Sequence, residues 1–192
     1  MDERLPRLTP GRLDAPQREL RQAITGGPRS SAPQPFSLTA ADGSLVGPFG
    51  LMLHAPHLGQ PLQELGAAVR YLTSFTDRER EIAILTVATA LDSDFEWWAH
   101  TRLGRSAGLS DAELDEIASG EFADRADVEP VEAAVHRAAR LLAARDALDD
   151  ERYAVLVAVL GEQRLVELAV LIGYYTTLAL MLDVFRVGSP PD

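Results

Sequence analysis

The sequence predicts an all-α protein, and three observations support this fold class. From Leu58 onward, apolar residues recur at the spacing of amphipathic helices. Runs in which β-branched and polar residues alternate, which would indicate strands, are few. The chain has 192 residues and is 46% hydrophobic, enough to enclose a single core. We therefore expect one helical bundle over residues 51–192, preceded by an N-terminal arm over residues 1–50.

The N-terminal arm is predicted to be largely irregular. Seven of the 12 prolines lie in residues 1–50, together with several glycines. Such a density of residues that interrupt regular structure leaves room for at most one short helix, near Pro16 to Ile24. We expect the arm to wrap around the core or around a neighbouring subunit.

Three capping boxes place the central helices. In each, a Ser or Thr is followed three residues later by a Glu, so that the two residues can satisfy each other's free backbone N–H groups at the start of a helix. Gly108 is expected to end the second of these helices in a left-handed conformation. The boxes and the helices that they predict are Thr76 with Glu79 (77–91), Ser93 with Glu96 (94–107) and Ser110 with Glu113 (111–119).

The C-terminal third of the chain is predicted to be helical throughout. Pro130 is tolerated in a first helical turn and begins a helix over 131–145, while Asp149 can cap a helix over 151–160. A long apolar helix follows. Glu167 and Asp183 interrupt its apolar run, and charges are costly at the centre of a bilayer, so we expect a buried or subunit-facing helix and no membrane span. Because a helix that is apolar on nearly every side needs cover, we expect a homo-oligomer: a dimer, trimer or hexamer.

Charge and composition exclude several classes of function. The chain carries 18 basic and 29 acidic residues, a net charge of −11 that repels phosphate backbones and anionic membrane surfaces, so we expect no nucleic acid and no membrane as partner. The absence of cysteine removes disulfides, thiolate metal sites and thiol redox chemistry. The first residues contain no apolar core of signal-peptide length, so the cytoplasm is the expected location.

Three side chains in the middle of the chain are candidates for catalysis. Glu96 and His100 are four residues apart, so they share a helix face, and a carboxylate beside an imidazole raises its pKa and fixes its tautomer. Glu81 lies on the preceding helix, which a short turn folds back antiparallel toward the same imidazole. We predict that His100, Glu81 and Glu96 form a catalytic acid–base group.

The stretch REREIAILTVATALDSDFEWWAHTRLGRSAG, residues 78–108, resembles the carboxymuconolactone decarboxylase family, whose superfamily includes the alkylhydroperoxidase D type peroxidases. The peroxidase motif is a Glu, followed by cysteines twelve and fifteen residues later and a His nineteen residues later. Counted from Glu81, these offsets fall on Ser93, Glu96 and His100. The Glu and His are kept and both thiols are replaced.

The resemblance extends over residues 47–187, including GPFGLMLHAPHLG and VLIGYYTTLALMLDVFRVG. It implies an alkylhydroperoxidase D-like helical bundle. A Ser hydroxyl cannot run a thiol–disulfide cycle, so thiol peroxidase activity is disfavoured. By elimination, the resemblance implies the decarboxylase-like branch, which uses no cofactor and acts on small carboxylated lactones. We therefore expect a lyase that acts on a small-molecule carboxylate, such as a carboxylated lactone or keto acid.

Five further residues are candidates for binding the substrate. One is a loop histidine, one occupies the first cysteine position of the motif, and one is the aromatic residue that follows Glu96. Two are arginines that could pair with a substrate carboxylate. No His-rich cluster occurs, and no metal or cofactor is predicted. The five candidates are His54, Ser93, Trp97, Arg80 and Arg102.

Every one of these residues also has a purely structural interpretation. Glu96 could serve only as a helix cap, His100 could be a core histidine, and Glu81 could pair with Arg78 or Arg102. The chain could then be a non-catalytic oligomeric binding or scaffold protein of the same fold. The same acid–base pair could also serve an isomerase, hydrolase or cyclase. An enclosed cavity that contains His100 and Glu81 within hydrogen-bond reach favours chemistry, whereas a filled core favours the scaffold.

Overall fold

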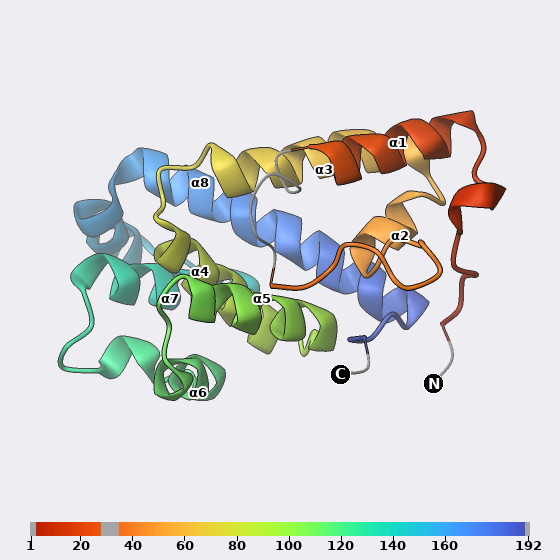
Figure 1. The fold of residues 1–192 in the computed structure, drawn as a ribbon. Helices are drawn as coiled ribbons and strands as arrows, with labels where there is room; N and C mark the ends of the chain where they lie inside the picture. The colour runs from red at the N-terminus through yellow and green to blue at the C-terminus, as the bar shows by residue number, and fades with distance from the viewer. Residues whose placement is uncertain (1–2, 28–34, 191–192) are drawn as a thin grey trace.

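The all-α prediction is confirmed. A computed structural model describes residues 3–27 and 35–190, and within these ranges the chain forms eight α-helices and no strand beyond an isolated bridge between Thr39 and Leu45 (Figure 1). The α-helices are α1 (Ala15–Gly26), α2 (Pro48–Met52), α3 (Pro56–Tyr71), α4 (Asp77–Ala90), α5 (Asp94–Ser106), α6 (Asp111–Ser119), α7 (Pro130–Ala143) and α8 (Asp150–Phe185), and two short 3-10 helices are η1 (Pro10–Arg12) and η3 (Phe122–Asp124).

The N-terminal arm contains more regular structure than expected and shares the core of the bundle. Asp14 and Gln17 form a capping box that begins α1, a helix of 12 residues that extends beyond the segment predicted. Leu20 and Ile24 on α1 are fully buried and belong to the main hydrophobic cluster. The expected boundary between residues 50 and 51 falls inside α2. The arm therefore packs as part of the same domain.

Two of the three predicted capping boxes form, and the third does not. Thr76 with Glu79 and Ser110 with Glu113 make both reciprocal hydrogen bonds. Ser93 begins α5 as predicted, but its side chain makes no capping hydrogen bond, so the prediction of a box with Glu96 is wrong. The physical reason is that the Glu96 carboxylate turns toward His100 on the same helix face, 3.4 Å away, instead of back toward the helix start.

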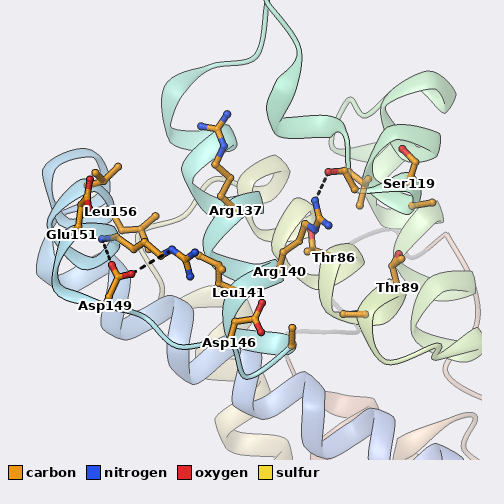
Figure 2. A pocket seen from close by; sticks show the side chains of 17 residues that line it. Thr86, Thr89, Ser119, Arg137, Arg140, Leu141, Asp146, Asp149, Glu151 and Leu156 are labelled. Carbon is orange, nitrogen blue, oxygen red and sulfur yellow. Dashed lines mark hydrogen bonds and ion pairs between the residues drawn. The ribbon is translucent and has the colours of Figure 1, made fainter.

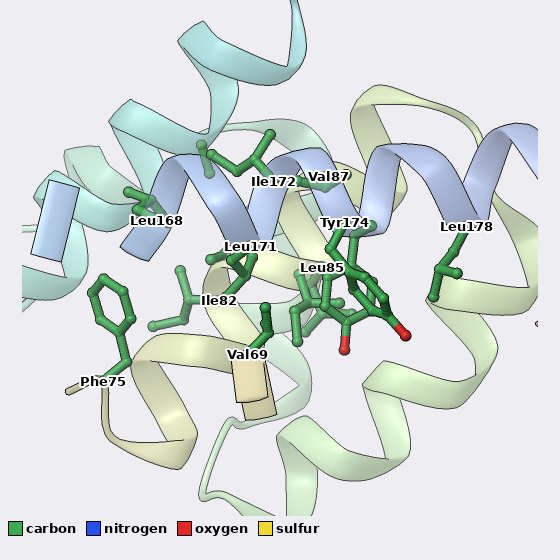
Figure 3. Close-up of a cluster of buried hydrophobic side chains, with 14 of the residues drawn as sticks. Val69, Phe75, Ile82, Leu85, Val87, Leu168, Leu171, Ile172, Tyr174 and Leu178 are labelled. Carbon is green, nitrogen blue, oxygen red and sulfur yellow. The ribbon is translucent and has the colours of Figure 1, made fainter. Parts of the chain in front are cut away.

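Helix α4 lies at the centre of the bundle, in contact with α5, α7 and α8. Ten consecutive residues of α4, 79–88, are buried, so this helix has almost no solvent-facing side. Leu168 and Leu171 of α8 pack against Ile82 of α4, with Val69 and Phe75 completing the layer (Figure 3). This burial encloses Glu81 in an apolar environment, where a carboxylate needs partners.

Helix α8 spans 36 residues but is broken at Gly161, whose φ of 76° and ψ of 162° are not helical. A glycine tolerates this left-handed backbone without a Cβ clash. Among the described residues, α8 alone is long and apolar enough to cross a membrane by length and composition, and half of its most apolar window is buried inside the fold. The core helix of a globular bundle passes the same test, and α8 packs against α4 and α7 as such a helix does.

Candidate active site

Glu81 and His100 face each other across the hairpin formed by α4 and α5. Asp92 takes a left-handed conformation, with φ of 50°, and Ser93 donates its N–H to the carbonyl of Ala88, so the chain reverses within three residues of the end of α4. Glu81 lies ten residues before Leu91 and His100 nine residues after it, which places them opposite each other in an antiparallel pair. The distance between His100 Nδ1 and Glu81 Oε2 is 2.6 Å.

The second ring nitrogen of His100 faces Glu96. Its Nε2 atom lies 3.4 Å from Glu96 Oε2, so the imidazole stands between two carboxylates from different helices. All three side chains are buried, with exposures of 2% for Glu81, 3% for Glu96 and 6% for His100. Glu96 Oε1 is buried and has no hydrogen-bond partner within the described part of the chain. The arrangement therefore keeps one acceptor free beside a potential proton donor.

Two residues that were not assigned to the catalytic group complete its surroundings. Arg70 on α3 places Nη1 3.7 Å from Glu81 Oε1, and the Tyr175 ring on α8 meets the His100 ring edge-on at a centroid distance of 5.1 Å. Arg70 was missed because its approach to Glu81 is a tertiary contact between α3 and α4. The one available sequence signal was that Arg70 is the single basic residue in the last turn of α3.

The two carboxylates keep His100 protonated. Burial lowers the pKa of the imidazole, but the charge of Glu81, its hydrogen bond and the contribution of Glu96 outweigh burial and raise the pKa of His100 to about 9. Burial raises the pKa of the Tyr175 phenol well above its usual value, and the charges of Glu81 and Glu96 act in the same direction. At neutral pH the site therefore holds an imidazolium at His100 and a neutral phenol at Tyr175.

A cavity of about 60 Å³ lies beside this group. Its walls include His100, Glu96, Arg70 and Tyr175, so all four reach the same space. A larger cavity of about 910 Å³ lies elsewhere, between α4, α6, α7 and the start of α8 (Figure 2). None of the residues that line the larger cavity belongs to the His100 group, and Arg140 at its wall is already used to hydrogen-bond the carbonyl of Gly120. Size alone therefore does not identify the site.

The five predicted substrate-binding residues are not among the residues that line the His100 cavity. His54 faces a different pocket, where its Nε2 lies 3.1 Å from the carbonyl oxygen of Pro6. Ser93 is buried at the start of α5, and its hydroxyl has no partner among the described residues. Trp97 packs against the main core, and it is the adjacent Trp98 that lines a pocket. Adjacent helical residues point in different directions, which separates these two rings.

The two predicted arginines are also engaged away from His100. Arg80 is buried and pairs with Asp77 one turn earlier on α4. Arg102 donates to the carbonyl of Trp98 and lies over the Trp98 ring at 4.4 Å. These placements correct the expectation that Arg80 or Arg102 supplies the cation of the site, because Arg70 holds that position. The alternative pairing of Glu81 with Arg78 is also wrong, since Arg78 bonds Glu113 and Glu132.

The sequence profile of the carboxymuconolactone decarboxylase family matches residues 56–158, more than half of the chain. The chain belongs to the carboxymuconolactone decarboxylase family. The resemblance noted from residues 78–108 is thereby confirmed at the level of the family. The matched range contains Glu81, Glu96 and His100, and the family likeness extends over α3 to the first part of α8.

Solved structures share the fold of this family member at low sequence identity. The alkylhydroperoxidase core protein of Ralstonia eutropha, an uncharacterised peroxidase-related protein, superposes with a TM-score of 0.75 and 16% identity over 98% of this chain and 92% of that one. The debrominase Bmp8, solved as an alanine variant with 2,3,4-tribromopyrrole, superposes with a TM-score of 0.73 and 13% identity, over 98% of this chain and 94% of that one. A protein of unknown function from Agrobacterium tumefaciens superposes with a TM-score of 0.63 and 17% identity, over 74% of this chain and 97% of that one. No curated protein sequence matches the chain.

Membership in the family leaves the reaction open, because proteins that share this fold are described as different kinds of enzyme. The neighbours range from peroxidase-related proteins to a debrominase. In this chain the positions that the peroxidase motif gives to cysteines hold Ser93 and Glu96. Glu96 introduces a carboxylate where that motif has a thiol, so thiol chemistry cannot occur at this position.

Proposed function

We propose that this chain is a cofactor-free acid–base enzyme of the carboxymuconolactone decarboxylase family that removes the carboxyl group of a small carboxylated lactone or keto acid. The observation that carries the proposal is the buried contact of 2.6 Å between His100 Nδ1 and Glu81 Oε2, with Glu96 on the other side of the ring. A buried imidazolium held by two carboxylates is an oriented proton donor. Its place in the cytoplasm is part of the same proposal.

The proposed reaction needs one proton donor and one cation. When the bond between the carboxyl carbon and the adjacent carbon breaks, carbon dioxide leaves and the electron pair passes into an enolate. His100 then delivers a proton to the enolate carbon, and solvent restores the proton to the ring. Arg70, which lines the same cavity, is the candidate partner for the substrate carboxylate or the enolate oxygen. A side chain of this length can pair with both Glu81 and a ligand.

A direct assay of carbon dioxide release tests the proposal. Acetoacetate and a panel of small carboxylated lactones are incubated with wild type, His100→Gln and Glu81→Gln, and carbon dioxide is measured over the uncatalysed rate. A positioned general acid contributes about 10²–10⁴-fold, so we expect losses of that order in kcat for His100→Gln. His136→Gln is the matched control, because His136 is also buried but lies on α7 outside the site. Equal rates in all four proteins would overturn the assignment.

A second candidate function is a non-catalytic oligomeric binding or scaffold protein, and the surface of α8 favours it. Val166, Val170, Leu180 and Val184 are exposed by 64%, 43%, 61% and 41%. Positions 173 and 177 are also exposed, so the exposed positions of α8 include 166, 170, 173, 177, 180 and 184. Their alternating intervals of four and three residues are typical of a contact surface between two helices. The small size of the His100 cavity points the same way, since sites for small molecules usually measure about 300–1,000 Å³.

A homo-oligomer is compatible with both functions, and we propose one that uses this α8 surface. A charged residue in the middle of an apolar seam has to be desolvated, so Leu180→Glu is expected to shift the molar mass toward that of a monomer in light scattering. Asp183→Lys, next to the same seam, is the control for a change of charge alone. If Leu180→Glu keeps the mass of the wild type, α8 is not the contact.

An isomerase, hydrolase or cyclase that uses the same acid–base group is tested by product analysis on the same panel of carboxylated lactones and keto acids.

A further inference from the structure

A second pocket of about 380 Å³ lies between the N-terminal arm, the start of α5 and the end of the chain. In Figure 1 the orange segment that follows α1 runs beside α5 and leads into α2, and a contact of 5.0 Å between the rings of Phe36 and Trp98 fixes that approach. The walls of this outer pocket are mainly apolar and aromatic, and include Leu5, Phe36, Val46, Leu51, Phe95 and Trp98. Its volume falls within the usual range for small-molecule sites, about 300–1,000 Å³.

The outer pocket and the His100 cavity share two walls. Phe36 and Phe95 line both spaces, so these two aromatic residues form a wall that the outer pocket shares with the cavity of the acid–base group. Phe95 immediately precedes Glu96 on α5, whose carboxylate lies on the inner side. A side chain can change rotamer without any movement of the backbone, so the two spaces can join when a ligand displaces one ring.

The position of the Phe95 ring depends on a glycine. Gly47 has a φ of 59°, and a Cβ atom at this residue would lie 2.1 Å from the Phe95 ring, inside its van der Waals surface. The backbone at residue 47 therefore packs directly against the ring, which an alanine would push aside. The arm thus determines where the shared wall stands.

The outer pocket is mainly apolar and the inner cavity is charged, and this difference indicates the kind of molecule that would fit both. The outer pocket presents mainly aromatic and aliphatic side chains, with Glu3, Arg7 and His54 also in its lining. Trp98 Nε1 is a buried donor that has no partner among the described residues. The inner cavity presents the His100 imidazolium, Arg70 and the free oxygen of Glu96. A molecule that occupies both has an apolar ring or branched alkyl body and a small polar head.

We infer that the outer pocket binds the apolar body of the substrate while its acidic head passes the Phe36 and Phe95 rings to reach His100. The substrate class is therefore an aryl- or alkyl-substituted small acid, larger than the 60 Å³ inner cavity alone can hold. This inference rests on the proposed acid–base function for the role of the head, whereas the binding of the apolar body to the outer pocket can be measured without any reaction.

A matched pair of substrates tests the inference in the full chain. Benzoylacetate and acetoacetate carry the same β-keto acid head and differ in a phenyl or methyl group. We expect a KM at least about tenfold lower for benzoylacetate, since even one methylene in a fitted pocket gives about 10–200-fold discrimination. Leu51→Ala should raise the KM for benzoylacetate by a larger factor than the KM for acetoacetate. Equal KM values for the two acids in the wild type would overturn the inference.

Two neighbouring tryptophans give a binding assay that needs no turnover. Trp97→Phe leaves Trp98, in the outer pocket, as the only tryptophan, and Trp98→Phe leaves Trp97, which packs against the core. The inert analogue 3-phenylpropanoate should change the fluorescence of Trp97→Phe saturably and leave that of Trp98→Phe unchanged. Butanoate, which lacks the phenyl group, should change neither.

The two assays separate failure of the pocket from failure of the reaction. A saturable Trp98 response without turnover of either keto acid would support the outer pocket and contradict decarboxylation. Turnover of both keto acids with equal KM and no Trp98 response would support the reaction and overturn the outer pocket. If neither binding nor turnover occurs, both proposals fail.

Discussion

The bundle contains two buried histidines, and their surroundings differ in every respect that matters for chemistry. His100 on α5 lies between Glu81 and Glu96, and these carboxylates, acting against burial, raise its pKa to about 9. His136 on α7 is fully buried, packs edge-on against Phe122 at 5.5 Å, and neither ring nitrogen has a partner within the described residues. Burial, followed by the positive charge of Arg140, lowers the pKa of His136 to about 4.

This comparison shows that burial alone makes a histidine inert. At neutral pH, His136 is an uncharged ring packed in the core, because no hydrogen bond from the described residues to its ring nitrogens stabilises the protonated form against burial. His100 is charged at the same pH because two acidic groups were placed against it. The informative signal for a functional site is therefore the set of companions, and the residue type by itself carries little.

The largest expected difference is in folding stability. His100→Leu leaves two buried carboxylates with only Arg70 nearby, and breaking a buried ion pair costs about 3–5 kcal/mol. His136→Leu replaces a ring without hydrogen bonds by an apolar group, which we expect to be close to neutral, within about 1 kcal/mol. Urea unfolding of both variants at pH 7 measures the two values. Similar losses would contradict the contrast between the two histidines.

The next effect is a loss of stability on the alkaline side. The folded pKa of His100, about 9, lies above the ordinary value of 6.5, so its stabilising contribution is complete below pH 6.5 and disappears as pH rises to about 9. The difference between the folded and unfolded pKa values of His100 corresponds to a total loss of about 3 kcal/mol in the free energy of unfolding across this pH interval. We expect the unfolding free energy of wild type to fall over this range and that of His100→Gln to fall much less. The kcat of an active enzyme should decline over the same upper range as the acid is lost.

An effect of about the same size is expected on the acidic side, because the pKa of His136 is shifted from 6.5 by as much as that of His100 but in the opposite direction. The folded pKa of His136, about 4, lies below 6.5, so the unfolded chain takes up a proton first and stability falls as pH decreases from 6.5 toward 4. The loss amounts to about 1.4 kcal/mol for each pH unit. His136→Leu should remove this part of the pH dependence, and the difference between wild type and variant isolates it from the carboxylates. A constant difference between pH 7 and pH 5 would show that His136 titrates normally.

The smallest effect separates the two carboxylates of the site. Glu81 lies 2.6 Å from the imidazole and Glu96 lies 3.4 Å away, so Glu81→Gln should lower the pKa of His100 more than Glu96→Gln does. Titration of the His100 ring proton by NMR measures both shifts, with His136 as an internal reference. The reverse order would mean that Glu96 is the principal partner.

Features specified by neighbouring residues could be predicted from the sequence. The boxes at Thr76 and Ser110, the proline start of α7 and the left-handed Gly108, with φ of 93°, all depend on groups a few residues apart. The pairing of Glu81 with His100 was also accessible, because one short turn connects their helices and the spacing on either side is nearly equal. The box at Ser93 failed because His100 competes for the same carboxylate.

Features that depend on the arrangement of distant helices could not be predicted. Arg70 reaches Glu81 from α3, and an arginine in the last turn of that helix does not by itself indicate which carboxylate it meets. Four of the five candidates for substrate binding were chosen for closeness in sequence to the motif, and His54 was chosen as a loop histidine. The cavity walls come instead from the segment before α2 and from α2, α3, α5 and α8. Likewise, a short helix was predicted near Pro16 to Ile24, but its sequence did not indicate that Leu20 and Ile24 belong to the main core.

The hairpin of α4 and α5 contains both members of the proton-handling pair, Glu81 and His100, within one short stretch of the chain. Because the proton-handling pair belongs to two consecutive helices, the loop that must close to bring it together is short and its entropic cost is small. A single contiguous cassette of about thirty residues, Asp77 to Ser106, therefore carries the reactive groups. Point changes inside this cassette, such as the exchange of a thiol for a carboxylate, can convert one chemistry into another while the rest of the bundle continues to shelter it.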